Sequence, residues 1–321
     1  MPNFSIVPRI LFWGTPEFAV PVLKRLLDEK YNVIGVVTNP DRAWGRSKTP
    51  GPSPVKICAL RHNIPVLQPE TLKDPGFVKA LREHDPDCFI VVAYGKIIPD
   101  EILRIAKRGA LNVHPALLPR WRGPSPIETA ILQGENMTGV SLMELDQQMD
   151  HGPIIAREEV SIQKDETALA LSAKLSLVGA RMLVRFLPDY LSGKAKPHPQ
   201  NDAEATFSKI LTKEDGHLLW DRPATMLERQ IRAFIRWPES YCFWQRGENS
   251  IRLKIEKAEV LPKTQETKPL GTVYETKLSP LTVETIDGAL GVLALTPEAK
   301  SSMSAAEFIR GHPEIIGAEL V

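Results

Sequence analysis

Apolar runs with the pattern of buried strands alternate with segments of helical spacing along the first half of the chain. Residues 9–13 predict a strand that leads into a helix, with Thr15 as its N-cap and Pro16 in its first turn. Further strands are predicted at 32–38, 64–67, 88–94, 110–114 and 139–145, and further helices at 54–61, 77–83, 99–106, 124–132 and 165–191. Strands that alternate with helices are typical of a Rossmann-like, doubly wound, mostly parallel α/β sheet.

The last third of the chain has a different pattern. Residues 193–208 are polar, contain prolines and predict a linker. Beyond a short helix at 223–233, strands are predicted at 241–244, 251–258, 271–274, 281–285 and 290–295. Five short strands in about a hundred residues are typical of a small, OB-like β-barrel. The patterns therefore predict an N-terminal domain at 1–192, a linker at 193–208 and a C-terminal β-barrel domain at 209–321.

A long loop at 39–54 interrupts the α/β pattern. It contains four prolines, two glycines, one tryptophan and the three cations Arg42, Arg46 and Lys48. Loops of this length inside a compact domain are usually functional or disordered. We therefore treat the loop as a candidate binding segment, in which Trp44 either stacks on a ligand or packs the loop onto the domain.

Length, charge and cysteine content narrow the class of protein. A chain of 321 residues accommodates two domains, and a formal net charge of +1 means that any nucleic-acid binding depends on a local basic patch. Three widely separated cysteines favour buried reduced thiols over disulfides or metal ligands. No apolar run approaches the roughly 18 residues of a membrane span, and the N-terminus lacks a signal-peptide pattern. We therefore expect a soluble, cytoplasmic protein, and a monomer.

A polar pair lies at the end of the strand predicted before Pro115. Asn112 and His114 are two residues apart on this strand, so their side chains project from the same side. Pro115 holds His114 extended, because a proline disfavours the helical region for the residue before it. The carboxyl ends of strands in open α/β sheets are where ligands bind, so the pair is a candidate site.

Two aspartates, Asp146 and Asp150, follow the next predicted strand. With Asn112 and His114 they offer an amide, an imidazole and a carboxylate, a set that suits acyl transfer to an amine. The amide can donate to the oxygen that gains charge, the imidazole can donate to it or move a proton, and the carboxylate can orient the imidazole or accept the proton. Taken singly, each residue also has a structural explanation as a turn former, core hydrogen bonder or cap, so only their combination indicates catalysis.

The combination resembles the folate-dependent formyltransferases. The Asn-Val-His run at 112–114, the Leu-Leu-Pro-Arg-Trp-Arg-Gly run at 117–123, and Asp150 are similar to that family's catalytic motif and folate-binding turn. The resemblance continues through the segments at 12–18, 37–42, 45–46, 52–56, 91–95 and 231–238. The loop at 39–54 and the segment at 231–238 are similar to members of the family that act on tRNA.

The resemblance implies the formyltransferase fold and a specific reaction. The formyl donor is expected to be 10-formyltetrahydrofolate, and the acceptor the α-amino group of methionyl initiator tRNA, for translation initiation. Asn112 and His114 are expected to act on the developing oxyanion and on proton transfer. Asp150 is expected to orient His114 and to help accept the ammonium proton. No metal is implied, since no His, Cys or Asp cluster has the spacing of metal ligands.

The resemblance also assigns binding residues for folate and tRNA. An apolar cleft is expected to hold the folate between two segments, which contribute Val92, Tyr94 and Gly95, and Ala116, Leu117, Leu118 and Pro119. The loop is expected to bind tRNA through Arg42, Trp44, Arg46 and Lys48. Among these, Arg46 is the expected contact to the acceptor stem.

The sequence departs from the family pattern at three places. Ala116 stands where the family commonly has a serine, so a hydroxyl contact to folate is lost. The loop carries Ser47 and Thr49 in a stretch where relatives commonly read Gly-Arg-Gly-Lys-Lys-Leu, so one cation is lost. Glu128 and Thr129 replace a commoner Gln-Arg pair.

Three other functions remain possible on the sequence. A nucleotide-binding oxidoreductase is disfavoured, because the first strand is followed by Gly14, Thr15 and Pro16 and not by GxGxxG. A related formyltransferase that acts on a nucleotide or nucleotide sugar is expected to lack the tRNA loop and the C-terminal signature. An RNA-binding module without catalysis has no need of the set Asn112, His114 and Asp150.

Overall fold

The fold comprises two compact units. A computed structural model describes residues 7–43, 50–262 and 268–321. The first unit comprises the chain up to Pro126 together with Met137–Ser161 and Ser172–Lys209, and the second comprises Ile127–Asn136, Ile162–Leu171 and Ile210–Val321. Across these described ranges, no helix is both long enough and apolar enough to span a membrane.

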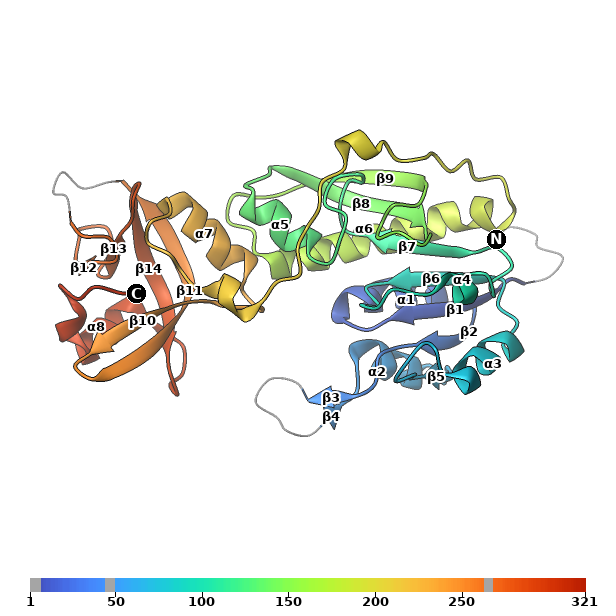
Figure 1. Cartoon of the computed structure of the whole chain (residues 1–321), viewed down its shortest axis with the longest axis horizontal. Helices are drawn as coiled ribbons and strands as arrows, with labels where there is room; N and C mark the ends of the chain where they lie inside the picture. Colours follow the sequence, from blue (N-terminus) through green and yellow to red (C-terminus); the bar gives the residue numbers. More distant parts are fainter. Residues whose placement is uncertain (1–6, 44–49, 263–267) are drawn as a thin grey trace. The chain divides into compact units, whose positions relative to one another are not determined.

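A seven-stranded sheet forms the centre of the first unit (Figure 1). Its spatial order is β5-β2-β1-β6-β7-β8-β9, and the strands from β5 to β7 run parallel. The last two strands are antiparallel to their neighbours. The strands are β1 (Arg9–Gly14), β2 (Asn32–Val37), β5 (Val66–Leu67), β6 (Cys88–Val92), β7 (Ala110–His114), β8 (Met137–Glu144) and β9 (Ile154–Ser161). The predicted mostly parallel, doubly wound sheet is confirmed.

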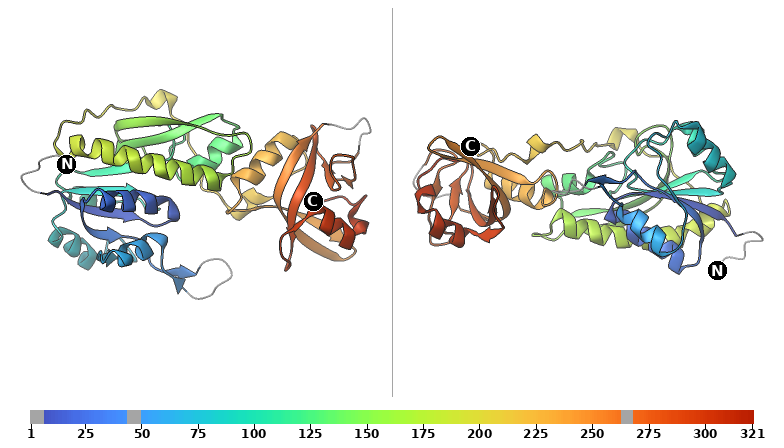
Figure 2. Two further views of the ribbon diagram at one scale, coloured as in Figure 1. Left: turned by 180° about the vertical axis from the view of Figure 1, so that it is seen from behind. Right: turned by 90° about the horizontal axis from the view of Figure 1, so that it is seen from below.

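Helices cover both faces of this sheet (Figures 1 and 2). One face carries α3 and α4, whose buried residues pack with Trp13 and Phe89 of the sheet. The other face carries α6, which contacts Val113 at Gly179. The helices of this unit are α1 (Val20–Asp28), α2 (Pro54–Arg61), α3 (Pro75–Glu83), α4 (Asp100–Leu103) and most of α6 (Ala168–Leu191), with short 3-10 turns η1 (Glu17–Ala19) and η2 (Asp202–Glu204). Helix α5 (Pro126–Leu132) belongs almost entirely to the second unit.

Two predicted helix starts have different outcomes. Ser53 caps α2 by accepting a hydrogen bond from the Lys56 amide at 3.1 Å, as its position before Pro54 predicts. The prediction that Thr15 caps a helix is wrong. Its hydroxyl instead accepts a hydrogen bond from Asn39 at 3.0 Å and donates to the carbonyl of Tyr94 at 3.4 Å. Thr15 therefore ties together the segments that follow β1, β2 and β6.

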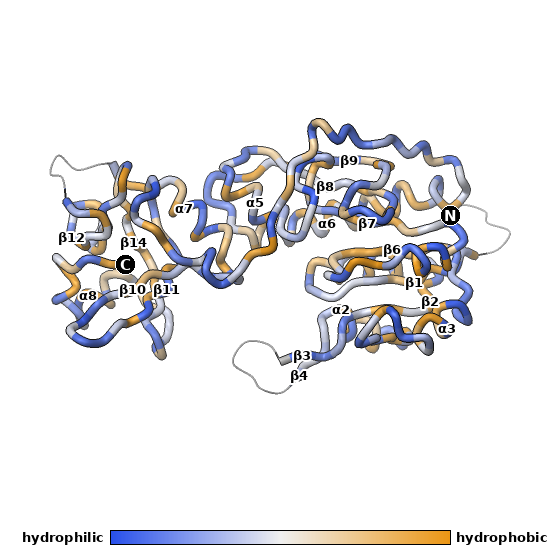
Figure 3. Tube along the Cα trace, viewed as in Figure 1, coloured by the Kyte–Doolittle hydropathy of each residue, from blue (hydrophilic) through white to orange (hydrophobic). Residues whose placement is uncertain are grey.

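The sequence did not predict strand β9, and it predicted a linker at residues 193–208. Strand β9 has one partly exposed face, and its apolar residues are too few to predict a buried strand. Residues 193–208 belong to the first unit, where His198 exchanges backbone hydrogen bonds with Ile154 at 2.8 and 2.9 Å. Figure 3 shows this segment as a hydrophilic stretch after α6, while hydrophobic residues concentrate in strands such as β1 and β6. Backbone hydrogen bonds therefore help to fix this polar segment to the first unit.

The second unit is built on an antiparallel sheet. Its strands run in the order β10-β11-β14-β13-β12, and β15 pairs with β14. They are β10 (Ser240–Arg246), β11 (Asn249–Leu261), β12 (Val273–Tyr274), β13 (Thr282–Glu284), β14 (Ala289–Pro297) and β15 (Met303–Ser304). Two short strands of the first unit, β3 (Arg42–Ala43) and β4 (Pro50–Gly51), form a separate pair. The prediction that the C-terminal domain is built on short β-strands is confirmed, and these strands form an antiparallel sheet.

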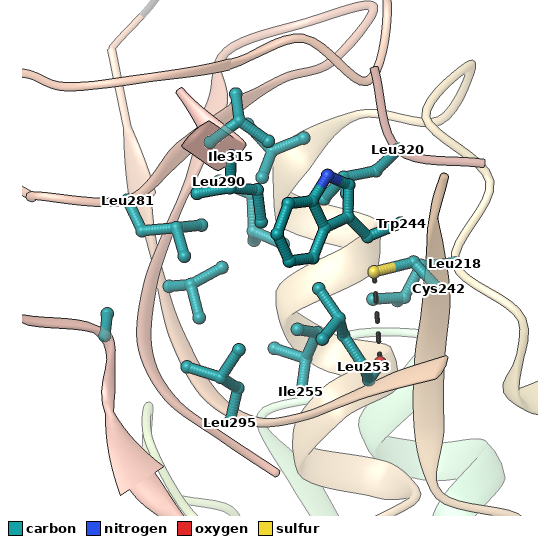
Figure 4. Close-up of a cluster of buried hydrophobic side chains, with 14 of the residues drawn as sticks. Leu218, Cys242, Trp244, Leu253, Ile255, Leu281, Leu290, Leu295, Ile315 and Leu320 are labelled. Carbon is teal, nitrogen blue, oxygen red and sulfur yellow. Dashed lines mark hydrogen bonds between the residues drawn. The ribbon is translucent and has the colours of Figure 1, made fainter. Parts of the chain in front are cut away.

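The end of the chain closes this sheet. Val321 exchanges backbone hydrogen bonds with Phe243 of β10 at 2.6 and 2.9 Å. Ala318 accepts from Val273 of β12 at 2.8 Å, so the last residues join the two outer strands. Inside, Trp244 packs among leucines and isoleucines, next to Cys242 (Figure 4). Helices α7 (Ala224–Ala233) and α8 (Ala305–Gly311) and turns η3 (Lys213–Gly216) and η4 (Pro313–Ile315) complete the unit, and α8 was not predicted.

Candidate active site

Strand β7 places Asn112 and His114 on one face of the sheet. Val113 points to the opposite face, where a Cβ built on Gly179 of α6 lies 2.5 Å from its Cγ1. Alternation along a strand therefore turns Asn112 and His114 away from α6. Both are nearly buried, with 8% and 4% of their surface exposed. The prediction that they share one face of one strand is confirmed by this geometry.

The imidazole of His114 lies between a backbone carbonyl and a carboxylate. Its Nε2 is 3.0 Å from the carbonyl oxygen of Trp121, and its Nδ1 is 3.6 Å from Oδ2 of Asp150. A carbonyl oxygen can only accept, so Nε2 carries a hydrogen in this arrangement. Nδ1 is then the atom that gains or loses a proton, and it is the atom that faces the carboxylate.

Asp150 lies in the connection between β8 and β9, and its carboxylate lies near His114 of the neighbouring strand β7. Because β8 is antiparallel to β7, Glu144 pairs with Leu111, and the connection begins beside the amino half of β7. The Asp150 carboxylate accepts a hydrogen bond from the Gly123 amide at 2.8 Å. Its backbone has φ of +48°, the left-handed region that aspartate tolerates better than most residues. The structure thus brings together the three predicted catalytic residues.

The Asn112 side chain is the free member of the set. No hydrogen-bond partner for its amide group is found among the residues that the structure describes, although the residue is nearly buried. A buried amide without a protein partner retains its full capacity to donate to a ligand. This capacity suits an oxygen atom that becomes negatively charged during a reaction.

Asp146, the other aspartate of this connection, has a different partner. Its carboxylate lies 2.6 Å from Nδ1 of His151, whose Nε2 lies 3.5 Å from Asp202. The hydrogen bond with Asp146 raises the pKa of His151 above its ordinary value. Asp146 therefore holds a second imidazole, and Asp150 alone of the two faces His114.

The predicted folate-binding turn is packed tightly into the first unit. The side chains of Ala116 and Leu118 have no exposed surface, and the Leu118–Pro119 peptide bond is cis. The Ser141 hydroxyl donates to the carbonyl of Ala116 at 2.7 Å and accepts from the amide of Leu118 at 3.0 Å. Leu117 packs against Gly139, where a Cβ would lie 2.5 Å from its Cδ2. Residues without exposed surface cannot touch a ligand, so within 116–118 the partly exposed Leu117 is the residue that can.

The second predicted folate-binding segment follows β6. Val92 is fully buried at the end of this strand and Tyr94 is 2% exposed, while Gly95 is exposed with φ of +82°. Burial raises the pKa of Tyr94 to about 12. Since β6 and β7 are parallel neighbours, this segment and the turn after β7 leave the sheet at the same edge. Gly95 offers exposed backbone there.

The predicted tRNA loop is only partly described. Arg42 is exposed in β3, whereas Trp44, Arg46 and Lys48 lie outside the described residues. The base of the loop is fixed, because Asp41 accepts from Lys56 and from Gln68, each at 2.7 Å. These contacts lower the pKa of Asp41, and the hydrogen bond with Gln68 is the largest cause.

Three groups at the site were not predicted from the sequence. They are the Trp121 carbonyl, the Gly123 amide and the Gln200 side chain. The Trp-Arg-Gly run at 121–123 was recognised as part of a motif, yet nothing in a sequence shows which backbone atoms a motif presents. Gln200 lies fifty residues after Asp150 and carries no local signal. In the described ranges, no three His, Cys, Asp or Glu side chains cluster as metal ligands.

Comparisons with known proteins identify the family of this chain. The family model for formyl transferase matches residues 8–187, and the model for the formyl transferase C-terminal domain matches residues 210–313. The methionyl-tRNA formyltransferase of Chloroflexus aggregans is 42% identical over 96% of this chain and 99% of its own length. The methionyl-tRNA formyltransferase of Idiomarina loihiensis is 40% identical over 97% of this chain and 99% of its own length.

Solved structures with a similar fold are more distant in sequence. The sugar 3N-formyl transferase WlaRD is 21% identical with a TM-score of 0.63, over 92% of this chain and all of that chain. HypX from Aquifex aeolicus, in complex with tetrahydrofolic acid, is 17% identical with a TM-score of 0.62, over 95% of this chain and 47% of that chain. At these identities the likeness supports the fold alone.

Proposed function

The chain belongs to the formyl transferase family, and from this premise we propose that it transfers a formyl group from 10-formyltetrahydrofolate to the α-amino group of methionyl initiator tRNA. The acceptor follows from relatives at 40–42% identity that match almost the whole chain, including the C-terminal unit. The observation that carries the chemistry is the convergence of Asn112, His114 and Asp150 beside β7. Translation initiation is the step that this product serves.

We assign proton transfer to His114 and Asp150. The methionyl amine is protonated at neutral pH and must lose a proton before it can attack the formyl carbon. Nδ1 of His114 can accept this proton, because its Nε2 hydrogen is already donated to the Trp121 carbonyl. The imidazolium that forms is stabilised by the Asp150 carboxylate at 3.6 Å. The reaction needs no covalent enzyme intermediate.

We assign stabilisation of the oxyanion to Asn112. Attack of the amine places negative charge on the formyl oxygen, and a preorganised donor lowers the energy of that state. The Asn112 amide suits this role, because it is nearly buried and has no hydrogen-bond partner among the described residues. When bound, 10-formyltetrahydrofolate supplies the formyl carbon, and the folate nitrogen departs with a proton.

We propose that the folate binds at the edge where β6 and β7 end. The candidates remain Val92, Tyr94 and Gly95, and Ala116, Leu117, Leu118 and Pro119. Because Ala116 and Leu118 have no exposed surface, we infer that this turn contacts the folate through the partly exposed Leu117. On this account the loss of the family's serine hydroxyl at Ala116 has little effect on affinity.

We propose that the tRNA is bound by two parts of the chain. The loop contributes Arg42, Trp44, Arg46 and Lys48, and the C-terminal domain at 209–321 supplies a further binding surface, separate from the catalytic domain at 1–192. A reaction on charged tRNA belongs in the cytoplasm, and we propose that the enzyme acts there as a monomer. Fold alone does not establish nucleic-acid binding, so each of these assignments needs its own test.

The experiment that tests the proposed function offers one donor with several acceptors. Purified full-length protein receives 10-formyltetrahydrofolate with charged initiator tRNA, free methionine, glycinamide ribonucleotide or a nucleotide-linked amino sugar. We expect formylation of the charged initiator tRNA and none of the small amines. Comparable rates on an amino sugar or on glycinamide ribonucleotide would refute the proposed acceptor.

A separate variant tests the loop. Arg46→Ala is expected to raise the KM for charged tRNA about tenfold, since a charge-assisted hydrogen bond contributes roughly 1.5–3 kcal/mol. The KM for the folate should not change, because phosphate contacts lie away from the pterin. Arg61→Ala, which removes an exposed cation at the end of α2, is the control. Equal losses for both substrates would contradict the assignment of Arg46.

A further inference from the structure

The backbone of Asp150 is held in an unfavourable conformation by a side chain that lies far along the chain. Its φ of +48° is costly for residues other than glycine, and such geometry persists only where surrounding contacts impose it. Nε2 of Gln200 donates to the carbonyl of Asp150 at 2.9 Å and to the carbonyl of Gly152 at 2.8 Å. One amide group therefore fixes the peptide unit that joins residues 150 and 151 and the one that joins residues 152 and 153.

The orientation of the Gln200 amide is fixed by Arg122. Its Oε1 accepts hydrogen bonds from Nε of Arg122 at 3.0 Å and from Nη2 at 2.9 Å. A guanidinium can only donate, and the two carbonyls can only accept. The amide therefore fits in a single orientation, and each of its groups has two partners. A rotated amide would place donor against donor and acceptor against acceptor.

Arg122 also lies between the two groups that contact His114 and Asp150. The residue before it provides the carbonyl for His114, and the residue after it provides the amide for Asp150. Its own side chain is 5% exposed, and its charge is paired with Asp202 at 2.8 Å. Its backbone amide donates to Thr206 at 2.9 Å, and its carbonyl accepts from Ser208 at 2.8 Å. The segment at 200–208 thus fixes the 121–123 turn from outside.

We propose that Gln200 is a positioning residue for formyl transfer, which together with Arg122 holds the Asp150 carboxylate and the His114 imidazole at their working separation. This inference rests on the proposed function. Gln200 touches no reacting atom, and it acts through the backbone of Asp150 and Gly152. The polar segment after α6 is on this account part of the catalytic apparatus, because its Gln200 bonds the carbonyls of Asp150 and Gly152.

The first test replaces the amide donors alone. Gln200→Glu keeps the length of the side chain and the acceptor for Arg122, and it removes the two N–H groups. We expect kcat to fall about 10- to 100-fold, as displacements of about 1 Å in catalytic groups produce, with both KM values changed less than threefold. Lys79→Ala is the control, since this side chain is 78% exposed on α3 and its salt bridge, at 3.7 Å, is with Glu83 of the same helix. Its kcat should equal that of the wild type.

A double-mutant cycle separates positioning from general stability. Gln200→Glu and Gln200→Met are each combined with Asp150→Asn, and circular dichroism and thermal unfolding establish that each full-length variant is folded. If Gln200 acts through Asp150, its substitution slows the Asp150→Asn enzyme less than threefold further. Full additivity of the two losses would overturn the inference, and so would wild-type kcat in folded Gln200→Glu. Failure of the wild type to formylate charged tRNA would instead refute the proposed function.

Discussion

Replacement of Asp150 by asparagine removes the charge of this residue and keeps the shape of its side chain. Asparagine tolerates the left-handed backbone at φ of +48°, and its Oδ1 can still accept from the Gly123 amide. Alanine changes more than the charge. It adds about 1–2 kcal/mol of backbone strain and leaves a buried amide unpaired at about 1–3 kcal/mol. Asp150→Asn is therefore the sharper variant, with a stability expected within about 1 kcal/mol of the wild type.

The expected effect of Asp150→Asn follows from the distance to His114. Two unit charges 3.6 Å apart interact by about 4–5 kcal/mol at an effective dielectric constant of about 20, which suits a partly buried pair. This energy favours the imidazolium that forms when His114 takes the proton of the amine. At about 1.4 kcal/mol for each tenfold change, it corresponds to roughly a thousandfold in rate. Part of it is retained by the asparagine dipole, so we expect kcat to fall by about 10²–10³.

Single-turnover formylation of charged initiator tRNA measures this effect. The assay uses saturating 10-formyltetrahydrofolate, so that the observed rate reports the chemical step and not product release. Thermal unfolding of the same preparation tests that the fold is intact. A rate within threefold of the wild type in folded Asp150→Asn would refute a role for the charge, because removal of the carboxylate charge 3.6 Å from His114 would then have no effect on catalysis.

Further predictions concern backbone geometry, protonation and thiol access. Gly123 has φ of +113°, and Gly123→Ala places a Cβ 2.7 Å from the Ser208 carbonyl oxygen. We expect this substitution to destabilise the fold by about 1–3 kcal/mol and to lower kcat, and an unchanged melting temperature would contradict this. The raised pKa of His151 means that its hydrogen bond with Asp146 stabilises the fold fully below about pH 6.5 and progressively less as pH rises through the raised value. The stability advantage of the wild type over His151→Gln should therefore shrink between pH 6 and pH 9 in chemical denaturation, and an advantage that grows with pH would refute the sign. Burial raises the pKa of the three thiols, Cys58, Cys88 and Cys242, and that of Cys242 to about 12. Iodoacetamide at pH 8 should therefore label these cysteines in urea and not in the folded protein, which mass spectrometry measures.

Local patterns predicted the order of the main elements because strand and helix spacing are local properties. The apolar run at Cys88–Val92 is fully buried in the middle of the sheet, as its composition implies. The same reasoning missed β9, which lies at the edge with alternate residues exposed, and α8, which is only seven residues long. It also assigned Thr15 to a helix cap, because a preference for capping cannot reveal the Asn39 and Tyr94 groups that compete for its hydroxyl.

Residue types and spacing by themselves determined the α/β class, the β-sheet of the C-terminal part and the placement of Asn112 and His114 on one side of a strand. These follow from the twofold repeat of a strand and from the chemistry of the side chains. Only the tertiary structure decided which aspartate faces His114, which backbone groups hold the pair, and that Gln200 belongs with them. Contacts such as those of Asp150 with Gly123 and Gln200 depend on how β8, β9 and the 200–208 segment pack. That packing reflects the sum of many weak interactions across the unit, which no single stretch of sequence encodes.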